Sequence, residues 1–320
     1  YQAEYGGEHL LSTETDSLSR LQEEWDSAPA SGPLTEPAGE TVLRLHLGPA
    51  RETGLPAELV NRLFVLSVSM RQGSQVGLEE RLTCLRACAD SFSFSEGELE
   101  KFLSTYRNAG YPALHHSDRY RAAYRPAYRL VAGAYGPLLP VLEQIEALRR
   151  TRERVVVAID GNCGGGKTTL ANLLAPLYYA PIIQMDDFFL PPELWSEERR
   201  RRANIHYERF GSEVLVPLSE GVPFDYRQYS CRLGRYDGTA HVEPAPVTVV
   251  EGTYCCHPEM GHSYDLRIFV ETGQAEQELR IRRRDGEDGW QRFRRLWIPL
   301  ENQYFTENKI REHSDLVIRT

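Results

Sequence analysis

The chain has 320 residues, which is enough for two domains of ordinary size. Hydrophobic residues make up 41% and charged residues 26%, and no run approaches the roughly 20 apolar residues that cross a bilayer. The net charge of −9 is shared by both halves, since residues 1–150 carry 15 basic against 20 acidic residues and residues 151–320 carry 22 against 26. We therefore expect no nucleic-acid partner and no membrane partner.

Signals for secretion or zinc binding are absent from the sequence. The first residues have no basic region followed by an apolar core, and the six cysteines form no C-x-x-C pair and no zinc spacing with histidine. Cys84 and Cys88 stand four apart in a helical pattern, so we expect two buried thiols on one helix face. These features favour a cytoplasmic protein.

The first segment predicts one short helix, a linker and a strand. Residues 16–25 favour a helix capped by Asp16 or Ser17, and the Pro-, Gly- and Ser-rich residues 27–40 are typical of a linker. Residues 41–47 alternate apolar and polar side chains, as a half-buried strand does. We expect residues 1–40 to be a flexible N-terminal segment and linker.

Helices dominate the prediction for the following residues. One helix is expected to begin at Pro56, and a second to run from a Ser95 cap to a stop at Gly110. A third pattern, over 136–150, leads into the C-terminal half. We therefore expect a mostly α-helical domain over 41–150.

From Arg154 onward, short apolar runs alternate with amphipathic stretches. Strands separated by helices imply right-handed crossovers and a mainly parallel sheet. The pattern predicts an α/β domain over 151–320, with the three-layer parallel sheet of a P-loop NTPase. The expected strands cover residues 154–160, 181–187, 246–252, 265–271 and 314–318.

A phosphate-binding loop follows the first of these strands. Residues 161–168 match G-x-x-x-x-G-K-[ST], and an amphipathic helix expected from Thr168 to Ala175, ended by Pro176, follows. The glycines let backbone N–H groups wrap the phosphates, Lys167 reaches the β- and γ-phosphates, and the Thr168 hydroxyl is a Mg²⁺ ligand. The sequence therefore predicts ATP and Mg²⁺ as cofactors. The expected nucleotide-binding residues are Gly161, Asn162, Cys163, Gly164, Gly165, Gly166, Lys167, Thr168 and Thr169.

Acidic residues end two other strands. Asp186 and Asp187 end the second strand, where a carboxylate can accept the proton of an acceptor hydroxyl or hold Mg²⁺. Glu251 ends another apolar strand, a place for a metal carboxylate. The alternatives are a turn or cap for the Asp pair and an ordinary strand-end acid for Glu251. We expect Asp186 to be the base, although the pattern leaves Asp187 open, and we expect Thr168, Glu251 and Asp186 to organise the metal.

Arginines cluster at the end of a later helix. Arg280 and Arg284 stand in the run ELRIRRRDG, next to Gly286 and Gly289. Phosphoryl transfer relies on positioning and charge neutralisation, so a mobile arginine-bearing lid is expected. The alternative is a solvated helix face.

Together, these motifs resemble the uridine kinase-like branch of the P-loop kinases, near phosphoribulokinase and bacterial pantothenate kinase. The resemblance covers residues 155–318. It implies that Asp186 is the base of a D-x-F motif, that Glu251 is the Glu of an E-G pair, and that Arg280 and Arg284 belong to an R-R-x-x-R-D lid in which Ile281 replaces an Arg. It also implies transfer of the γ-phosphoryl group of ATP to a hydroxyl of a nucleoside such as uridine or cytidine.

The acceptor side departs from the family. His206 stands where uridine kinases carry an Asp, and Tyr229 stands where they carry a His, while Tyr226 keeps the register. We expect His206, Arg209, Tyr226 and Tyr229 to line the acceptor pocket. The sequence leaves the identity of the acceptor and a homo-oligomer open.

The motifs bear on three other functions. A regulatory P-loop ATPase, with a partner bound by the N-terminal half, is the main alternative to a kinase; a GTPase is disfavoured because residues 308–311 read N-K-I-R and lack the Asp of N-K-x-D. Tyr120, Tyr124 and Tyr128 interleave with arginines, which can stack bases. Because this half is acidic, we expect instead a pair of helices packed through these rings.

Overall fold

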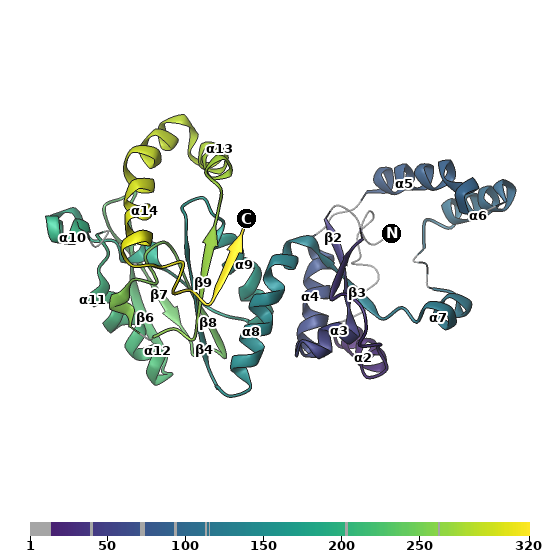
Figure 1. Cartoon of the computed structure of the whole chain (residues 1–320), viewed down its shortest axis with the longest axis horizontal. Helices are drawn as coiled ribbons and strands as arrows, with labels where there is room; N and C mark the ends of the chain where they lie inside the picture. The colour runs from purple at the N-terminus through teal and green to yellow at the C-terminus, as the bar shows by residue number, and fades with distance from the viewer. Residues whose placement is uncertain are drawn as a thin grey trace. The chain divides into compact units, whose positions relative to one another are not determined.

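A computed structural model describes residues 14–38, 41–70, 74–92, 95–112, 114, 116–201, 204–261 and 263–320 (Figure 1). The chain forms two compact units, Tyr1–Gly136 and Pro137–Thr320. The division precedes the boundary expected at residue 150, because the helix over 139–149 packs against the sheet of the second unit. Among the described residues, no helix combines the length and apolarity needed to cross a membrane.

The first unit contains a small antiparallel sheet with strand order β1-β2-β3. The strand expected over 41–47 is confirmed as β2, and Leu45 on it is fully buried. The segment expected to be a flexible linker also contributes to the fold, because it contains β1. The strands are β1 (Thr35–Pro37), β2 (Val42–His46) and β3 (Tyr128–Ala132).

Helices of the first unit pack against this sheet and against each other. The leading helix begins before the expected caps, so Asp16 and Ser17 lie inside it, and Ser17 donates a hydrogen bond to Asn61 at 2.7 Å. Pro56 occupies the N-cap of the next long helix rather than its first turn. The helices are α2 (Glu14–Trp25), α3 (Leu47–Glu52), α4 (Ala57–Ser69), α5 (Gln75–Ala87), α6 (Glu96–Asn108) and α7 (Asp118–Tyr124).

Helices α5 and α6 form a pair joined by the ion pairs Arg107–Glu79 and Arg86–Glu100. Arg107 donates two hydrogen bonds of 2.8 Å to the Glu79 carboxylate. Ser95 caps α6 as expected by accepting from the Glu98 N–H at 3.3 Å. The prediction that Cys84 and Cys88 are buried is wrong, because both are exposed and α5 buries a different face through Leu78.

The tyrosine-rich segment does not form the expected helix pair. It holds one helix, α7, with no buried residue, and then enters β3, where Tyr128 lies. The Tyr120 ring lies 4.5 Å from that of His116 and 4.7 Å from that of Tyr124, and Arg44 lies over Tyr128. Arg125, in the left-handed conformation at φ 44°, ends the helix.

The second unit contains the expected parallel sheet, with strand order β10-β9-β4-β8-β5. Figure 1 shows helices on both sides of it. Val157, Ile159 and Val249 in its central strands are fully buried. The strands are β4 (Val155–Gly161), β5 (Ile182–Gln184), β8 (Val247–Glu251), β9 (Leu266–Glu271) and β10 (Leu316–Arg319), beside a separate antiparallel hairpin of β6 (Phe224–Ser230) and β7 (Arg235–Val242).

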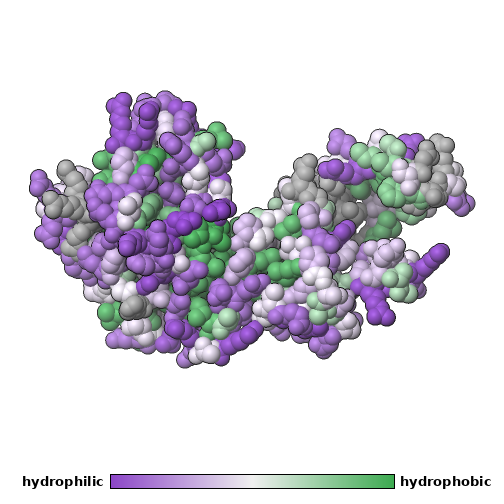
Figure 2. Space-filling model, in the orientation of Figure 1, coloured by the Kyte–Doolittle hydropathy of each residue, from purple (hydrophilic) through white to green (hydrophobic). Residues whose placement is uncertain are grey.

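Two helices of this unit differ from a regular pattern. Pro176 does not end its helix, which continues to Tyr178, because a proline inside a helix removes one hydrogen bond and need not end it. Gly286 adopts φ 73° and ψ −174° and breaks α13 into two segments. Hydrophilic side chains cover the region of α13 (Figure 2). The helices are α8 (Leu139–Arg149), α9 (Lys167–Tyr178), α10 (Glu197–Arg201), α11 (Tyr207–Phe210), α12 (Val216–Glu220), α13 (Gln274–Arg292) and α14 (Ile298–Glu307).

Candidate active site

The loop between β4 and α9 forms a tight turn around the Lys167 side chain. Its ammonium group donates to the Gly161 carbonyl at 2.8 Å, the Asn162 carbonyl at 3.0 Å and the Thr253 hydroxyl at 3.0 Å. Gly166, the N-cap of α9, has a left-handed backbone and no side-chain cap. The first-turn N–H groups of α9 therefore lack a side-chain acceptor, which is the arrangement that binds phosphate.

Glycine is required at the start of this loop. A Cβ on Gly161 would lie 2.1 Å from the backbone oxygen of Val270, and its φ of 136° is strained for other residues. A Cβ on Gly165 would lie 2.7 Å from the Asn162 oxygen. The backbone thus approaches β9 so closely at Gly161 that no side chain fits between them.

Thr168 and Glu251 meet at the end of the central strands. Glu251 pairs in register with Ile159, two residues before the loop, and it accepts a hydrogen bond from the Thr168 hydroxyl at 3.0 Å. Burial raises the pKa of Glu251, while the Thr168 hydrogen bond and the Lys167 charge oppose the rise. A hydroxyl and a carboxylate side by side are oxygen ligands that suit Mg²⁺, so the residues fit the metal that a P-loop kinase uses.

Asp160, which the sequence reasoning missed, anchors the loop from below. One carboxylate oxygen accepts from the N–H groups of Gly161 at 2.7 Å and Tyr254 at 3.2 Å; the other accepts from the Cys256 N–H at 3.0 Å and the Tyr304 hydroxyl at 2.7 Å. Burial raises the pKa of Asp160, and these donors oppose the rise. An acid at the end of an apolar run, next to the first loop glycine, was the available signal.

Two further buried side chains hold the loop, and both were missed. Glu301 on α14 accepts from the Cys163 N–H at 2.9 Å, and Gln277 on α13 donates to the Cys163 carbonyl at 2.9 Å. Both side chains lie far along the chain from the loop, and no local motif marks them. Cys163 is therefore fixed by the fold through its backbone.

The two neighbouring aspartates after β5 have different surroundings. Asp187 is buried and accepts a hydrogen bond from Gln228 at 3.1 Å. Asp186 keeps solvent-accessible surface, although protein surrounds it closely enough to raise its pKa by desolvation, a rise that Lys167 and Arg284 oppose. Burial also raises the pKa of Asp187, against the hydrogen bonds from Gln228 and Tyr226. Asp186 is thus the carboxylate that an incoming molecule can reach.

Of the four expected acceptor residues, Arg209 and Tyr226 contact Asp187, and His206 pairs through its backbone with Phe188. Arg209 is buried and donates to the Asp187 backbone carbonyl, and its guanidinium lies 4.2 Å from the Phe188 ring centre. The Tyr226 ring also stacks on the Phe188 ring, with the ring centres 5.3 Å apart. His206 caps α11 by accepting from the Arg209 N–H at 3.3 Å.

The hairpin carries the fourth expected acceptor residue, Tyr229, and its turn holds a cysteine near the aspartates. Tyr229 is buried and lies edge-on to Tyr236, with ring centres 5.7 Å apart. Cys231, in the turn after β6, is surface-accessible, but partial burial and the nearby charges of Asp186 and Asp187 raise its pKa to about 11. The hairpin turn therefore lies beside Asp186, and no sequence motif marks the position of this thiol.

The arginines of the expected lid divide into two groups. Arg280 donates to the Thr320 hydroxyl at 3.1 Å and to the Gly165 carbonyl at 3.4 Å, so it already contacts the loop. Arg284 pairs with Asp285 at 2.8 Å and belongs to the end of the first segment of α13. The break at Gly286 separates this arginine-bearing segment from the rest of the helix.

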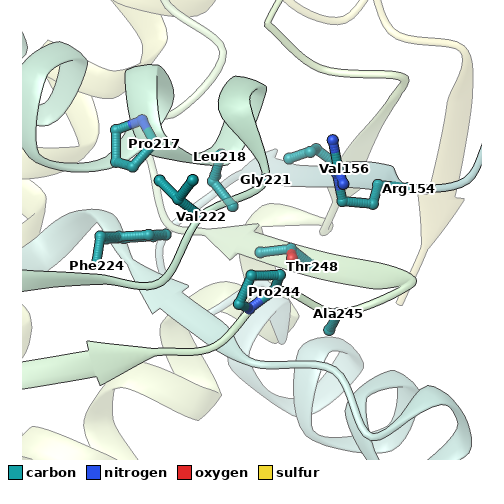
Figure 3. A pocket seen from close by; sticks show the side chains of 10 residues that line it. All are labelled: Arg154, Val156, Pro217, Leu218, Gly221, Val222, Phe224, Pro244, Ala245 and Thr248. Carbon is teal, nitrogen blue, oxygen red and sulfur yellow. The ribbon is translucent and has the colours of Figure 1, made fainter.

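A small pocket lies elsewhere, at the beginning of the same strands. Arg154, Leu218 and Thr248 are among its lining residues, and Figure 3 shows their side chains. Gly161 and Glu251 stand at the opposite ends of β4 and β8. This pocket is therefore not part of the candidate active site.

Comparison with known proteins identifies the family. No family model matches the chain. The uridine kinase of Streptococcus uberis is 30% identical over 172 residues, which cover 51% of this chain and 80% of that protein. The chain belongs to the uridine kinase family. The uridine kinase of Limosilactobacillus reuteri (strain DSM 20016) is 27% identical over 164 residues, covering 47% of this chain and 72% of that protein.

Membership of the uridine kinase family confirms the prediction of an ATP-dependent kinase with a small-molecule acceptor. Among solved structures, a possible uridine kinase from Bacillus stearothermophilus aligns at a TM-score of 0.42 and 17% identity, covering 56% of this chain and 99% of that one. The parallel sheet and the loop described above are the P-loop kinase fold that was expected.

Proposed function

We propose that this protein transfers the γ-phosphoryl group of ATP to a hydroxyl of a nucleoside, with uridine and cytidine as the leading acceptors. The names of its relatives support a nucleoside as the acceptor. The accessible Asp186 carboxylate near Lys167 supports phosphoryl transfer to a hydroxyl. The replacement of an Asp by His206 leaves room for another nucleoside-like alcohol.

The loop residues hold the nucleotide. The N–H groups of Asn162, Cys163 and Gly165 already donate within the protein, so the remaining N–H groups of the loop and the uncapped start of α9 face the phosphates. Lys167 exchanges its contacts with the Gly161 and Asn162 carbonyls for phosphate oxygens. Thr168 and Glu251 would hold Mg²⁺, which would supply positive charge to neutralise the phosphates. Asp160, by holding the Gly161 N–H, keeps this turn in one conformation.

Asp186 acts as the base. It orients the acceptor hydroxyl, takes its proton as the oxygen attacks phosphorus, and is a stronger base than an ordinary aspartate because desolvation raises its pKa. Asp187 is occupied by Gln228 and by the Arg209 contact to its carbonyl. The different surroundings of these two carboxylates are the observation on which the proposal rests.

Arginines and the hairpin complete the site. Arg280 and Arg284 neutralise phosphate charge when the arginine-bearing segment of α13 closes about Gly286. Tyr226 and Arg209 hold the segment that carries Asp186 through contacts with Asp187 and Phe188. They therefore position Asp186 and do not touch the acceptor themselves. His206 and Tyr229 are the side chains we assign to the acceptor itself.

Paired substitutions test the base. Asp186→Asn keeps the shape and removes the charge, and we expect turnover to fall by roughly 10²–10⁴ with the KM for ATP nearly unchanged. Asp187→Asn is the matched control, because it alters a neighbouring carboxylate that is held by the fold. It should lower thermal stability and keep turnover within about tenfold of the parent, on the scale of one lost hydrogen bond. The opposite pattern would make Asp187 the base.

A further inference from the structure

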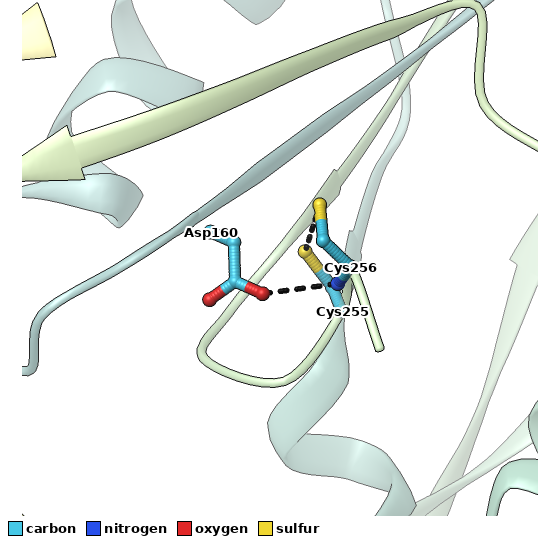
Figure 4. A group of neighbouring side chains, drawn as sticks. All are labelled: Asp160, Cys255 and Cys256. Carbon is cyan, nitrogen blue, oxygen red and sulfur yellow. Dashed lines mark hydrogen bonds between the residues drawn. The ribbon is translucent and has the colours of Figure 1, made fainter. Parts of the chain in front are cut away.

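Two adjacent cysteines lie next to the buried aspartate that anchors the loop. Cys255 and Cys256 follow β8, four and five residues after Glu251, and Asp160 is the last residue but one of β4 (Figure 4). One sulfur of each cysteine and a carboxylate oxygen of Asp160 all lie within 4.8 Å of one another. The kinase reaction described above uses neither thiol.

The distance between the sulfurs distinguishes two kinds of chemistry. The two Sγ atoms lie 3.9 Å apart. A disulfide needs about 2.05 Å between them, and its Cα atoms usually stand about 4.4 Å or more apart, farther than neighbouring residues reach. Two thiolates on one tetrahedral Zn²⁺, each about 2.3 Å from the ion, stand about 3.8 Å apart. The geometry fits a shared metal ion better than a disulfide.

The donor set selects the class of ion. Two thiolates and one carboxylate suit a thiophilic, borderline-soft divalent cation, whereas Mg²⁺ prefers oxygen ligands alone. Asp160 and Cys255 are fully buried, and Cys256 is only partly buried, so an ion would enter on the side of Cys256. The fourth tetrahedral position remains for water.

We propose that Cys255, Cys256 and Asp160 bind one thiophilic divalent cation of the zinc class beside the phosphate-binding loop. Binding replaces the two thiol protons, which pass to the solvent, and forms two metal–sulfur bonds and one metal–oxygen bond. Because the Asp160 carboxylate also holds the Gly161 N–H, the ion acts on a group that positions the loop.

Tyr304 competes with the ion for Asp160. The carboxylate already accepts four hydrogen bonds, and the Tyr304 hydroxyl is the partner that can turn away from it, since the other three are backbone N–H groups. Removing this hydroxyl frees one lone pair for the metal. Tyr304→Phe should therefore tighten Zn²⁺ binding severalfold.

Titration of the full chain, without an affinity tag, tests the site. Zn²⁺ is followed by calorimetry and Cd²⁺ by its thiolate charge-transfer absorption. We expect one ion per chain, loss of the charge-transfer band in Cys255→Ser and Cys256→Ser, and an unchanged band in the matched control Cys84→Ser/Cys88→Ser. Those control residues are an exposed cysteine pair on another element. No binding by the parent, or a band that depends on Cys84 and Cys88, overturns the proposal.

A measurement on the unmodified protein covers the case in which a serine variant does not fold. Alkylation of the native chain, read by mass spectrometry at each cysteine, should slow strongly at Cys256 when Zn²⁺ is added. Alkylation of Cys84, Cys88 and Cys231, which are exposed, should proceed at the same rate. Equal alkylation of Cys256 with and without Zn²⁺ contradicts the site.

Discussion

The hydrogen bond from Tyr304 to Asp160 makes a quantitative prediction about stability. Both side chains are buried, and the hydroxyl donates to a carboxylate oxygen at 2.7 Å. A hydrogen bond to a charged group contributes about 1.5–3 kcal/mol, against about 0.5–1.5 kcal/mol for a neutral pair. Tyr304→Phe should therefore lower the free energy of unfolding by about 2 kcal/mol. For a unit of this size that corresponds to about 4–8 °C in the melting temperature.

Tyr264→Phe is the matched control. Tyr264 is also buried, and its hydroxyl donates to the neutral Cys255 carbonyl at 2.9 Å, so the same atom is removed with no charge involved. We expect a loss of about 1 kcal/mol. The assay is calorimetric melting of the full chain. The transition whose melting temperature rises when Mg²⁺-ATP is added belongs to the unit that binds nucleotide.

The comparison of the two variants decides the argument. A loss for Tyr304→Phe about twice that for Tyr264→Phe supports a charged, loop-anchoring Asp160. Equal losses, or a smaller loss for Tyr304→Phe, would show that the carboxylate is not the charged anchor that we infer.

Three other changes test separate parts of the structure. Glu251→Gln should raise the Mg²⁺ concentration needed for half-maximal turnover by about 10–100-fold without unfolding the protein. Mg²⁺ titration of the initial rate measures this, and an unchanged titration would remove Glu251 from the metal site. Gly161→Ala should abolish ATP binding, measured by calorimetry, because its Cβ would lie 2.1 Å from a backbone oxygen, whereas Gly211→Ala, which meets nothing within 4 Å, should bind normally. Hydrogen bonds from Arg107 lower the pKa of Glu79 from 4.5 to about 2. The Glu79–Arg107 pair should therefore contribute its full stability above pH 4.5 and lose it as the pH falls toward 2. A midpoint near 4.5 in a ¹³C titration of the Glu79 carboxyl would contradict this.

The parts of the site that lie in one stretch of sequence were predictable. The loop at 161–168 is a local motif, and every strand predicted for the C-terminal half lies in the parallel sheet, since apolar runs bounded by turns report a buried strand directly. Family membership confirms the kinase reaction that the order of these motifs indicated.

The residues that support the loop could not be predicted in the same way. Glu301 and Tyr304 act through contacts that span 138 and 144 residues of sequence. Asp160 also accepts hydrogen bonds from Tyr254 and Cys256, which lie 94 and 96 residues away. Such contacts depend on tertiary packing and leave no periodic pattern. Similarly, helical spacing placed Cys84 and Cys88 on one face but did not show that α5 buries another face.

Predictions from local sequence preferences were also wrong where contacts with residues distant in sequence decide the structure. Asp16 and Ser17 are good caps, but α2 continues through them because Ser17 bonds to Asn61 on α4. Tyr128 has the spacing of a helix and lies instead in β3, paired with His46 of β2. In both cases a partner distant in sequence decides the backbone conformation.

Product analysis after incubation with Mg²⁺-ATP tests the central proposal most directly. With uridine or cytidine added in turn, we expect ADP and the nucleoside 5′-monophosphate in equal amounts, identified by mass spectrometry, and loss of both products in Asp186→Asn. ADP that forms at the same rate without any nucleoside, with no phosphorylated acceptor, would contradict the proposal and favour a regulatory ATPase.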